Sequence, residues 1–108
     1  MTTKKYEIYR ANLDPTIGAE IKKTRPVVII SDNWMNKFLR TVVICPLTTK
    51  LHPQWRSRIQ IKSAGKKSEI AVDQIRTISK LRLIEKIDDL AETDAKILRK
   101  LITEMYGE

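Results

Sequence analysis

The chain contains few of the residues that build metal, nucleotide and disulfide sites. It has one cysteine and one histidine, which are too few for a tetrahedral site of nitrogen and sulfur ligands. Neither a P-loop nor a GxGxxG motif is present among its three glycines. Cys45 has no partner for an intramolecular disulfide and lies in an apolar segment, so we interpret it as a small core residue. We therefore expect neither a metal nor a cofactor.

Long apolar runs are also missing. No segment approaches the roughly 20 apolar residues that a membrane helix needs, and residues 1–5 lack the apolar stretch of a signal peptide. We therefore expect a cytoplasmic protein without membrane contact. The 108 residues, 42% of them hydrophobic, fit one domain spanning 1–108 with one core. Because aromatic residues make up only 6%, that core must consist mainly of Ile, Leu and Val.

The charge of the chain is biased to the basic side. There are 21 Lys and Arg residues against 13 Asp and Glu residues, which gives a net charge of +8. Such a balance indicates a polyanionic partner, which could be RNA, DNA or an acidic protein segment. No acidic residue lies between Asn33 and Ser68, whereas acids collect near the C-terminus. The sequence thus predicts a basic central sheet face and a charge-mixed tail.

Short β-branched and alternating segments predict a mainly β protein of five to seven strands. The expected strands cover residues 6–13, 27–31, 41–47, 56–62, 68–75 and 78–84, with a short helical turn at 34–39. In the segment 56–62 apolar residues alternate with Arg58, Gln60 and Lys62, which predicts a basic outer face. Many short strands with few crossover helices favour a small barrel.

The C-terminal segment has a helical period instead. The apolar residues on one helical face are Leu98, Leu101, Ile102 and Met105. This spacing predicts an amphipathic helix of about four turns. Asp89 and Glu92 have the spacing of a capping box at its start, and Gly107 suits its end.

The chemistry left to such a chain is RNA cleavage without a metal. The 2′-hydroxyl of RNA can attack its own phosphate, so the protein has to position the phosphate, neutralise its charge and help move two protons. Arg25 precedes a buried strand and Thr48 follows another, where a side chain is held firmly yet faces solvent. On residues alone, Arg56 and Thr49 are equally eligible.

Four collinear motifs resemble those of a known family. Residues 13–20 (LDPTIGAE) and 23–33 (KTRPVVIISDN) form a loop followed by an RPV strand, and residues 43–49 (VICPLTT) contain a strand ending in PLT. Residues 72–78 (VDQIRTI) form a DQIRTI segment, followed by KLRL at 80–83. In this order and spacing, over about residues 6–106, they resemble the MazF/PemK/Kid family of toxins from type II toxin–antitoxin systems.

The resemblance implies an SH3-like barrel of the MazF/CcdB type with a C-terminal amphipathic helix, working as a homodimer. It implies a sequence-specific, ribosome-independent endoribonuclease that cleaves single-stranded mRNA without a metal. The implied products carry 2′,3′-cyclic phosphate and 5′-hydroxyl ends. The implied partners are single-stranded RNA and an acidic antitoxin protein that competes for the same basic groove.

The same resemblance assigns site residues. It makes Arg25 and Thr48 the catalytic pair, with Arg25 as a phosphate clamp rather than a base, because a guanidinium is effectively always charged. The candidate RNA-binding residues are Glu20, Lys22, Lys23, Thr49, Trp55, Arg56, Arg58, Asp73 and Gln74. Trp34 and Trp55 have two open interpretations, which are stacking on bases and packing against the barrel or a dimer seam.

Some positions depart from the family pattern. Ala19 stands where several relatives carry His or Ser, and the loop before the RP motif, residues 21–24, lacks the usual glycine. Ala71 replaces an Arg found in some relatives. Two alternatives therefore stay open, namely a CcdB-like toxin that binds DNA gyrase and a non-catalytic RNA-binding barrel. The gyrase-binding alternative would not need the pair Arg25 and Thr48.

Overall fold

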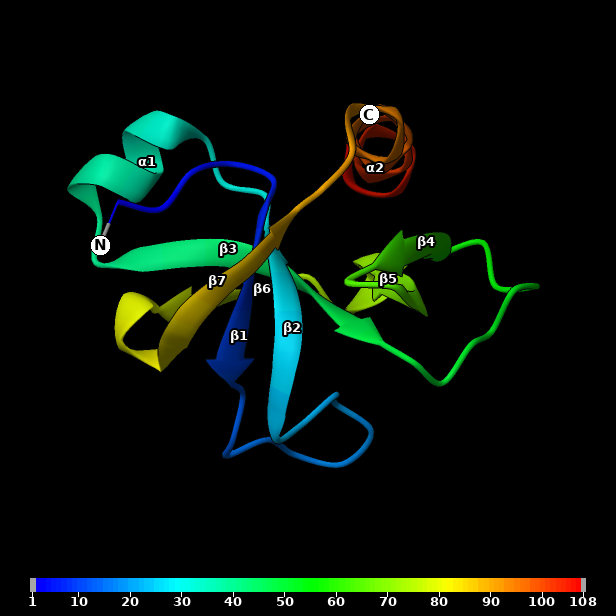
Figure 1. The fold of residues 1–108 in the computed structure, drawn as a ribbon, viewed down its shortest axis with the longest axis horizontal. Coiled ribbons are helices and arrows are strands. Elements are labelled where there is room, and N and C mark those ends of the chain that lie inside the picture. Colours follow the sequence, from blue (N-terminus) through cyan, green and yellow to red (C-terminus); the bar gives the residue numbers. More distant parts are fainter. Residues whose placement is uncertain (1, 108) are drawn as a thin grey trace.

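The computed structural model describes residues 2–107, and within them the chain forms seven strands and two α-helices (Figure 1). In chain order the elements are β1 Glu7–Asn12, β2 Thr24–Ile29, α1 Asn33–Phe38, β3 Thr41–Thr48, β4 Arg58–Ser63, β5 Lys66–Ala71, the 3-10 turn η1 Val72–Gln74, β6 Arg76–Ser79, the 3-10 turn η2 Lys80–Arg82, β7 Leu83–Asp89 and α2 Glu92–Tyr106. The expected mainly β fold with a C-terminal helix is confirmed. No helix in residues 2–107 is long and apolar enough to cross a membrane.

The strands form one antiparallel sheet that curls into a half-barrel. Its order is β4-β5-β3-β2-β1-β7, and β6 pairs with β3 outside this path. Strand β3 changes its pairing partner along its length. Its residues 41–44 pair with β6, whereas its residues 47–48 pair with β5. Strand β2 pairs with β3 at residues 44–46. This change of partner along β3 bends the sheet and positions β5 beside the end of β3.

Two apolar clusters pack on the two faces of the curled sheet. One lies under α2, with Val28, Leu47, Ile70 and Leu98 among its fully buried members. The other contains Val27, Ile29 and Ile44 together with residues of β1 and β7. Because neighbouring β2 residues enter different clusters, β2 is buried on both faces, and the prediction of a buried strand after Arg25 is confirmed. The expected Ile, Leu and Val core is confirmed as well.

Helix α2 begins later than its capping box predicts. The N-cap is Ala91, and no side chain caps the first turn. Asp89 instead ends β7, where it pairs with Glu7 of β1 and its carboxylate lies 3.0 Å from Lys86 Nζ. The prediction that Asp89 caps the helix is therefore wrong, because sheet pairing extends the strand through this residue.

Strands β4 and β5 are joined by a tight hairpin turn. Ala64 and Gly65 both have positive φ, 49° and 78°, which a two-residue hairpin turn requires. Asp88 of β7 holds this turn, because its Oδ2 accepts hydrogen bonds of 3.1 Å from Ser63 Oγ and from the Ala64 amide.

The predicted strands at 68–75 and 78–84 differ most from the structure. The first begins at Lys66 and ends at Ala71, where η1 turns the chain. The second divides into β6, η2 and β7, and β7 continues to Asp89 as the partner of β1. Exposed charged residues dominate the outer part of β7, so its strand character comes from pairing with β1 rather than from an apolar period.

Candidate active site

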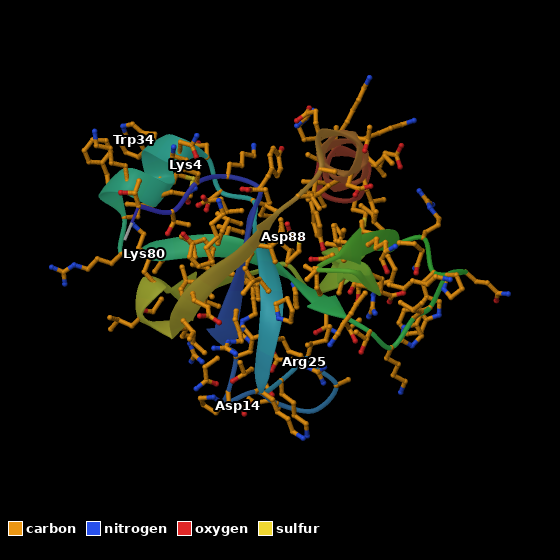
Figure 2. The ribbon with its side chains drawn as sticks, viewed as in Figure 1. Lys4, Asp14, Arg25, Trp34, Lys80 and Asp88 are labelled. Carbon is orange, nitrogen blue, oxygen red and sulfur yellow. The ribbon has the colours of Figure 1, made fainter. Side chains whose placement is uncertain are left out.

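The structure brings Arg25 and Thr48 to one edge of the half-barrel. The last pair joining β2 and β3 is Val27 with Pro46. Carrying that register two residues further along both strands places Arg25 opposite Thr48. Figure 2 shows Arg25 near the end of β2 that leads into the β1–β2 loop, which also carries Asp14. Two neighbouring strands therefore present a guanidinium and a hydroxyl at the same edge.

Both side chains retain capacity to bind an anion. Arg25 is half-buried and donates through Nε to the Lys22 carbonyl at 3.3 Å. Within residues 2–107 no carboxylate forms an ion pair with Arg25. Thr48 Oγ1 accepts a hydrogen bond from the Lys50 amide at 3.1 Å, which leaves the hydroxyl proton available for an acceptor. The pair thus offers a positive fork and a hydroxyl donor.

Arg25 and Thr48 line one small cavity of about 40 Å³. Its lining residues are Arg25, Pro26, Leu47, Thr48, Thr49 and Ser68. Thr49 is a predicted RNA-binding residue, whereas Ser68 of β5 is a hydroxyl that sequence reasoning missed. Ser68 enters the site because β5 pairs with the end of β3, a pairing that no local pattern reveals.

The β1–β2 loop beside the site is tied down by side chains. Gln74 Oε1 accepts from the Ile21 amide at 2.6 Å, and Gln74 Nε2 donates to the Ala19 carbonyl at 3.5 Å. Glu20 Oε1 accepts from the Ile17 amide at 2.7 Å. The two predicted residues Glu20 and Gln74 thus line one hollow of about 310 Å³ at this loop.

The remaining predicted residues of this loop face solvent. Lys22 and Lys23 are both exposed. The backbone of Lys23 is held by Asp14, whose Oδ1 accepts from the Lys23 amide at 2.9 Å. The loop therefore presents two cations close to Arg25 while its backbone stays fixed.

A buried ionic network lies under the β3–β4 loop, residues 49–57. Its centre is Glu69 of β5, whose side chain is 0% exposed. Glu69 accepts hydrogen bonds from Arg58 Nη1 at 2.6 Å, from Gln60 Nε2 at 2.8 Å and from the backbone amide of His52 at 2.5 Å. The Nδ1 atom of His52 lies 3.1 Å from the same carboxylate. Arg58 also donates through Nε to Asp73 at 2.8 Å.

This network corrects the expected position of Arg58. Alternation along β4 predicts that Arg58 faces solvent with Gln60 and Lys62, yet its side chain is only 5% exposed. The guanidinium is turned inward because two carboxylates, Glu69 and Asp73, lie within hydrogen-bonding distance. The two predicted residues Arg58 and Asp73 therefore pair with each other, and the outer face of β4 retains the charge of Lys62 alone.

The network also determines the pKa of its members. Burial alone raises the pKa of Glu69, but the hydrogen bonds from His52, Gln60 and Arg58 outweigh it and lower this pKa to about 2. For Asp73 too, burial raises the pKa, but the hydrogen bonds from Arg58 and Ser57 together with the charge of Arg58 outweigh it, so the pKa is lowered. Both carboxylates are therefore ionised at neutral pH, and Glu69 is a buried charge compensated by donors.

Acid is expected to destabilise the protein through Glu69. Since its folded pKa of about 2 lies below the ordinary value of 4.5, the carboxylate stabilises the fold above pH 4.5 and loses this effect as the pH falls toward 2. The full contribution is about 3 kcal/mol. Urea unfolding between pH 7 and 2.5 measures it. Glu69→Gln should give a flatter pH dependence than wild type, and parallel curves would contradict the assignment.

Trp55 and Arg56, the other predicted residues of the β3–β4 loop, are exposed. Trp55 is 49% exposed and stacks on His52 with ring centroids 3.9 Å apart. Arg56 lines a groove of about 420 Å³ between β4 and α2, together with Lys100 and Glu104. Trp34 lies on α1, which Figure 2 shows well away from Arg25. Figure 1 shows the β3–β4 loop, which carries Trp55, on the side of the molecule away from α1, so the two tryptophans belong to different surfaces.

Other chemistries find less support in these residues. Cys45 is fully buried, and burial raises the pKa of its thiol to about 12, so the predicted core role is confirmed. Among the residues that the structure describes, no group of three or more His, Cys, Asp and Glu side chains could hold a metal ion. The sequence analysis did not select Glu69 as a candidate residue. The one sequence feature that points to a buried carboxylate there is the position of this single acid directly before the apolar run 70–72.

The fold and the site define a small protein with a curled β half-barrel that carries an arginine and a threonine on one cavity at its edge. Residues 4–106 match the family described as PemK-like, MazF-like toxin of type II toxin–antitoxin system. The chain is 32% identical to Endoribonuclease MazF of Staphylococcus saprophyticus over 94% of this chain and 88% of that protein. It is 34% identical to Endoribonuclease EndoA of Bacillus subtilis over 83% of this chain and 82% of that protein. The chain therefore belongs to the PemK-like, MazF-like toxin family.

Solved structures agree with the fold. The crystal structure of MazF from Deinococcus radiodurans superposes with a TM-score of 0.87 at 16% identity, over 100% of this chain and 99% of that chain. A MazE–MazF structure from the same organism gives a TM-score of 0.80 at 14% identity, over 99% and 97% of the two chains. At these identities the likeness concerns the fold, and it confirms the half-barrel with its C-terminal helix.

Proposed function

We propose that this protein, an endoribonuclease of the PemK-like, MazF-like toxin family, cleaves single-stranded mRNA without a metal and independently of the ribosome. In the proposed reaction the 2′-oxygen attacks the adjacent phosphorus and the bond to the 5′-oxygen breaks. One proton leaves the 2′-hydroxyl and one reaches the departing 5′-oxygen. The products carry a 2′,3′-cyclic phosphate and a 5′-hydroxyl.

The observation that carries the proposal is that Arg25, at the start of β2, and Thr48, at the end of β3, line the same small cavity. Arg25 has no carboxylate partner within residues 2–107, so its charge is available to the phosphorane dianion. The hydroxyl of Thr48 lies on the same small cavity and can donate to a phosphate oxygen. Arg25 remains protonated throughout and acts as a clamp. The gyrase-binding alternative does not need this arrangement.

The proposed path of the RNA follows the exposed loops around this pair. Lys22, Lys23 and Arg56 are exposed cations on the loops before β2 and after β3. Phosphates bind such side chains without reading sequence. Asp73 and Gln74 contribute to the site by holding its surroundings, since Asp73 binds Arg58 and Gln74 binds the β1–β2 loop.

Two protein partners belong to the proposal. An acidic antitoxin suits the net charge of +8, and a relative of this fold is known as a MazE–MazF complex. A second copy of the chain suits the exposed apolar side chains Trp34, Phe38 and Leu81, which are 65%, 62% and 95% exposed. Lys80 lies beside Phe38 and Leu81, and its ammonium donates to the Asn36 carbonyl of α1; Figure 2 labels Lys80 below α1, which carries Trp34.

Cleavage of a long single-stranded RNA in EDTA tests the proposed function. Wild type should produce discrete fragments that carry 5′-hydroxyl ends. Thr48→Val keeps the side-chain shape but removes the hydroxyl, so the rate should fall by about 10²-fold or more. Thr48→Ser keeps the hydroxyl and should stay within about tenfold of wild type.

A matched control separates chemistry from folding in this experiment. Thr103→Val removes a hydroxyl from α2, where it donates to the Arg99 carbonyl at 3.0 Å, and should leave the rate unchanged. Intact RNA with wild-type protein in EDTA, and cleavage restored by a divalent metal, would contradict metal independence. Intact RNA under both conditions would contradict the nuclease proposal itself.

A further inference from the structure

Trp55 has one covered face and one open face. The ring of His52 stacks on the indole at 3.9 Å with an interplanar angle of 21°, and the guanidinium carbon of Arg58 lies 4.7 Å from the indole centroid. His52 Nδ1 and Arg58 Nη1 are only 3.4 Å apart. Groups on opposite faces of one ring would be separated by roughly twice a stacking distance, so His52 and Arg58 lie on the same face. With this face covered, the 49% exposure of Trp55 indicates that its opposite face is open to solvent.

Glu69 connects the two groups that cover this face, His52 and Arg58, to the sheet. This carboxylate holds Arg58 by a side-chain hydrogen bond and holds His52 at both its backbone amide and its ring. Glu69 and Arg58 belong to the paired strands β5 and β4, and Asp73 fixes the other side of the guanidinium. The loop residue Trp55 is thereby supported by groups that the sheet immobilises.

This support lies directly beside the candidate catalytic hydroxyl. Thr48 and Glu69 are register partners across β3 and β5. The loop that carries Trp55 begins at the residue after Thr48 and ends where Arg58 opens β4. An RNA strand whose phosphate binds at Thr48 therefore meets the flat ring of Trp55 in the loop that follows Thr48.

The surroundings of the open face suit a nucleic acid strand. Lys50 and Arg56 are exposed cations on either side of Trp55 in the sequence. A π-face next to cations is the combination that binds single-stranded RNA by base stacking and phosphate contact. An acidic peptide would use the cations, but it would gain little from a flat ring.

We propose that the open face of Trp55 is a stacking platform for one nucleobase of the RNA, and that Glu69 is the positioning residue that fixes this platform through His52 and Arg58. The inference rests on the proposed ribonuclease function. A ring that is immobilised before binding loses less conformational freedom when a base stacks on it. Glu69 therefore acts on RNA affinity without touching the RNA.

Binding of an uncleavable strand tests the platform. The probes are fluorescein-labelled 12-nucleotide homopolymers of the four bases, with hydrogen in place of every 2′-hydroxyl, measured by anisotropy at low salt. Stacking of one base corresponds to about 5- to 150-fold in Kd. Trp55→Ala should raise Kd about tenfold for the best-bound strand, and Trp55→Phe should recover most of this loss.

A double-variant cycle tests the role of Glu69. Glu69→Gln should weaken binding several-fold, and adding Trp55→Ala to it should cost much less than in wild type, because the platform is already displaced. His52→Ala removes the supporting ring from a partly exposed position and should also weaken binding several-fold. It takes the place of Glu69→Gln in the cycle if Glu69→Gln folds poorly. In a Trp34→Phe background the remaining Trp55 fluorescence should be quenched by the strand, and less so with His52→Ala.

Each part of the inference has a result that would overturn it. Unchanged Kd in Trp55→Ala overturns the platform, and an equal cost of Trp55→Ala with and without Glu69→Gln overturns the positioning role. Quenching by an oligoglutamate peptide but not by any strand would assign the surface to a protein partner and also overturn the inference. The strand cannot be cleaved, so binding through Trp55 by a protein that cleaves no RNA would contradict the proposed function alone.

Discussion

Replacing Arg25 with alanine is expected to lower the rate of RNA cleavage by about 10²–10³-fold while the protein stays folded. The guanidinium is the positive group on the cavity shared with Thr48, and no carboxylate within residues 2–107 neutralises it. Its hydrogen bond to protein is a single 3.3 Å contact with the Lys22 carbonyl, so the fold depends little on it. Single-turnover cleavage of a long single-stranded RNA in EDTA measures the effect, with thermal unfolding as the check on folding.

Two further variants show whether geometry or charge is responsible for that loss. Arg25→Lys keeps the charge but not the planar fork that binds two phosphate oxygens, so its rate should lie between those of wild type and Arg25→Ala. Arg40→Ala removes an exposed arginine between α1 and β3 and should change the rate by no more than about threefold. A loss with Arg40→Ala equal to that with Arg25→Ala would show that total charge, not the site, limits cleavage.

The sequence predicted the pair at this site only through motifs. On residue type and position alone Arg25 could not be separated from Arg56, nor Thr48 from Thr49. The structure separates the two arginines, because Arg25 lines the cavity at the ends of β2 and β3 whereas Arg56 lies against α2. Thr48 and Thr49 both line that cavity. Strand register joins segments that lie far apart in the chain, so no local pattern in either strand contains it.

The buried network escaped prediction for a related reason. Period-two alternation describes where a Cβ atom points, and it correctly buries Ile59 and Ile61. The long side chain of Arg58 turns back inward because Glu69, on a different strand, offers a buried acceptor. Strand β7 shows the same limit, since cross-strand ion pairs such as Arg10 with Glu85, at 2.9 Å, stabilise a segment whose composition does not favour a strand.

Replacing Arg58 with alanine is expected to destabilise the fold by about 3–5 kcal/mol, since removing one partner of a buried ion pair leaves the other charge uncompensated. The charge left behind is Glu69, which is 0% exposed and loses its 2.6 Å contact. For a domain of this size the loss should lower Tm by more than about 10 °C. Urea and thermal unfolding at pH 7 measure the effect.

An exposed arginine provides the matched comparison. Arg10 pairs with Glu85 at a similar distance, 2.9 Å, but the two side chains are 47% and 54% exposed. Arg10→Ala should therefore cost less than about 1 kcal/mol. The double variant Arg58→Met with Glu69→Leu removes both buried charges and should recover much of the stability lost in Arg58→Ala. If Arg58→Ala cost no more than Arg10→Ala, the buried network would be contributing little to the fold. If the double variant were as unstable as Arg58→Ala, the loss would come from packing rather than from an uncompensated charge.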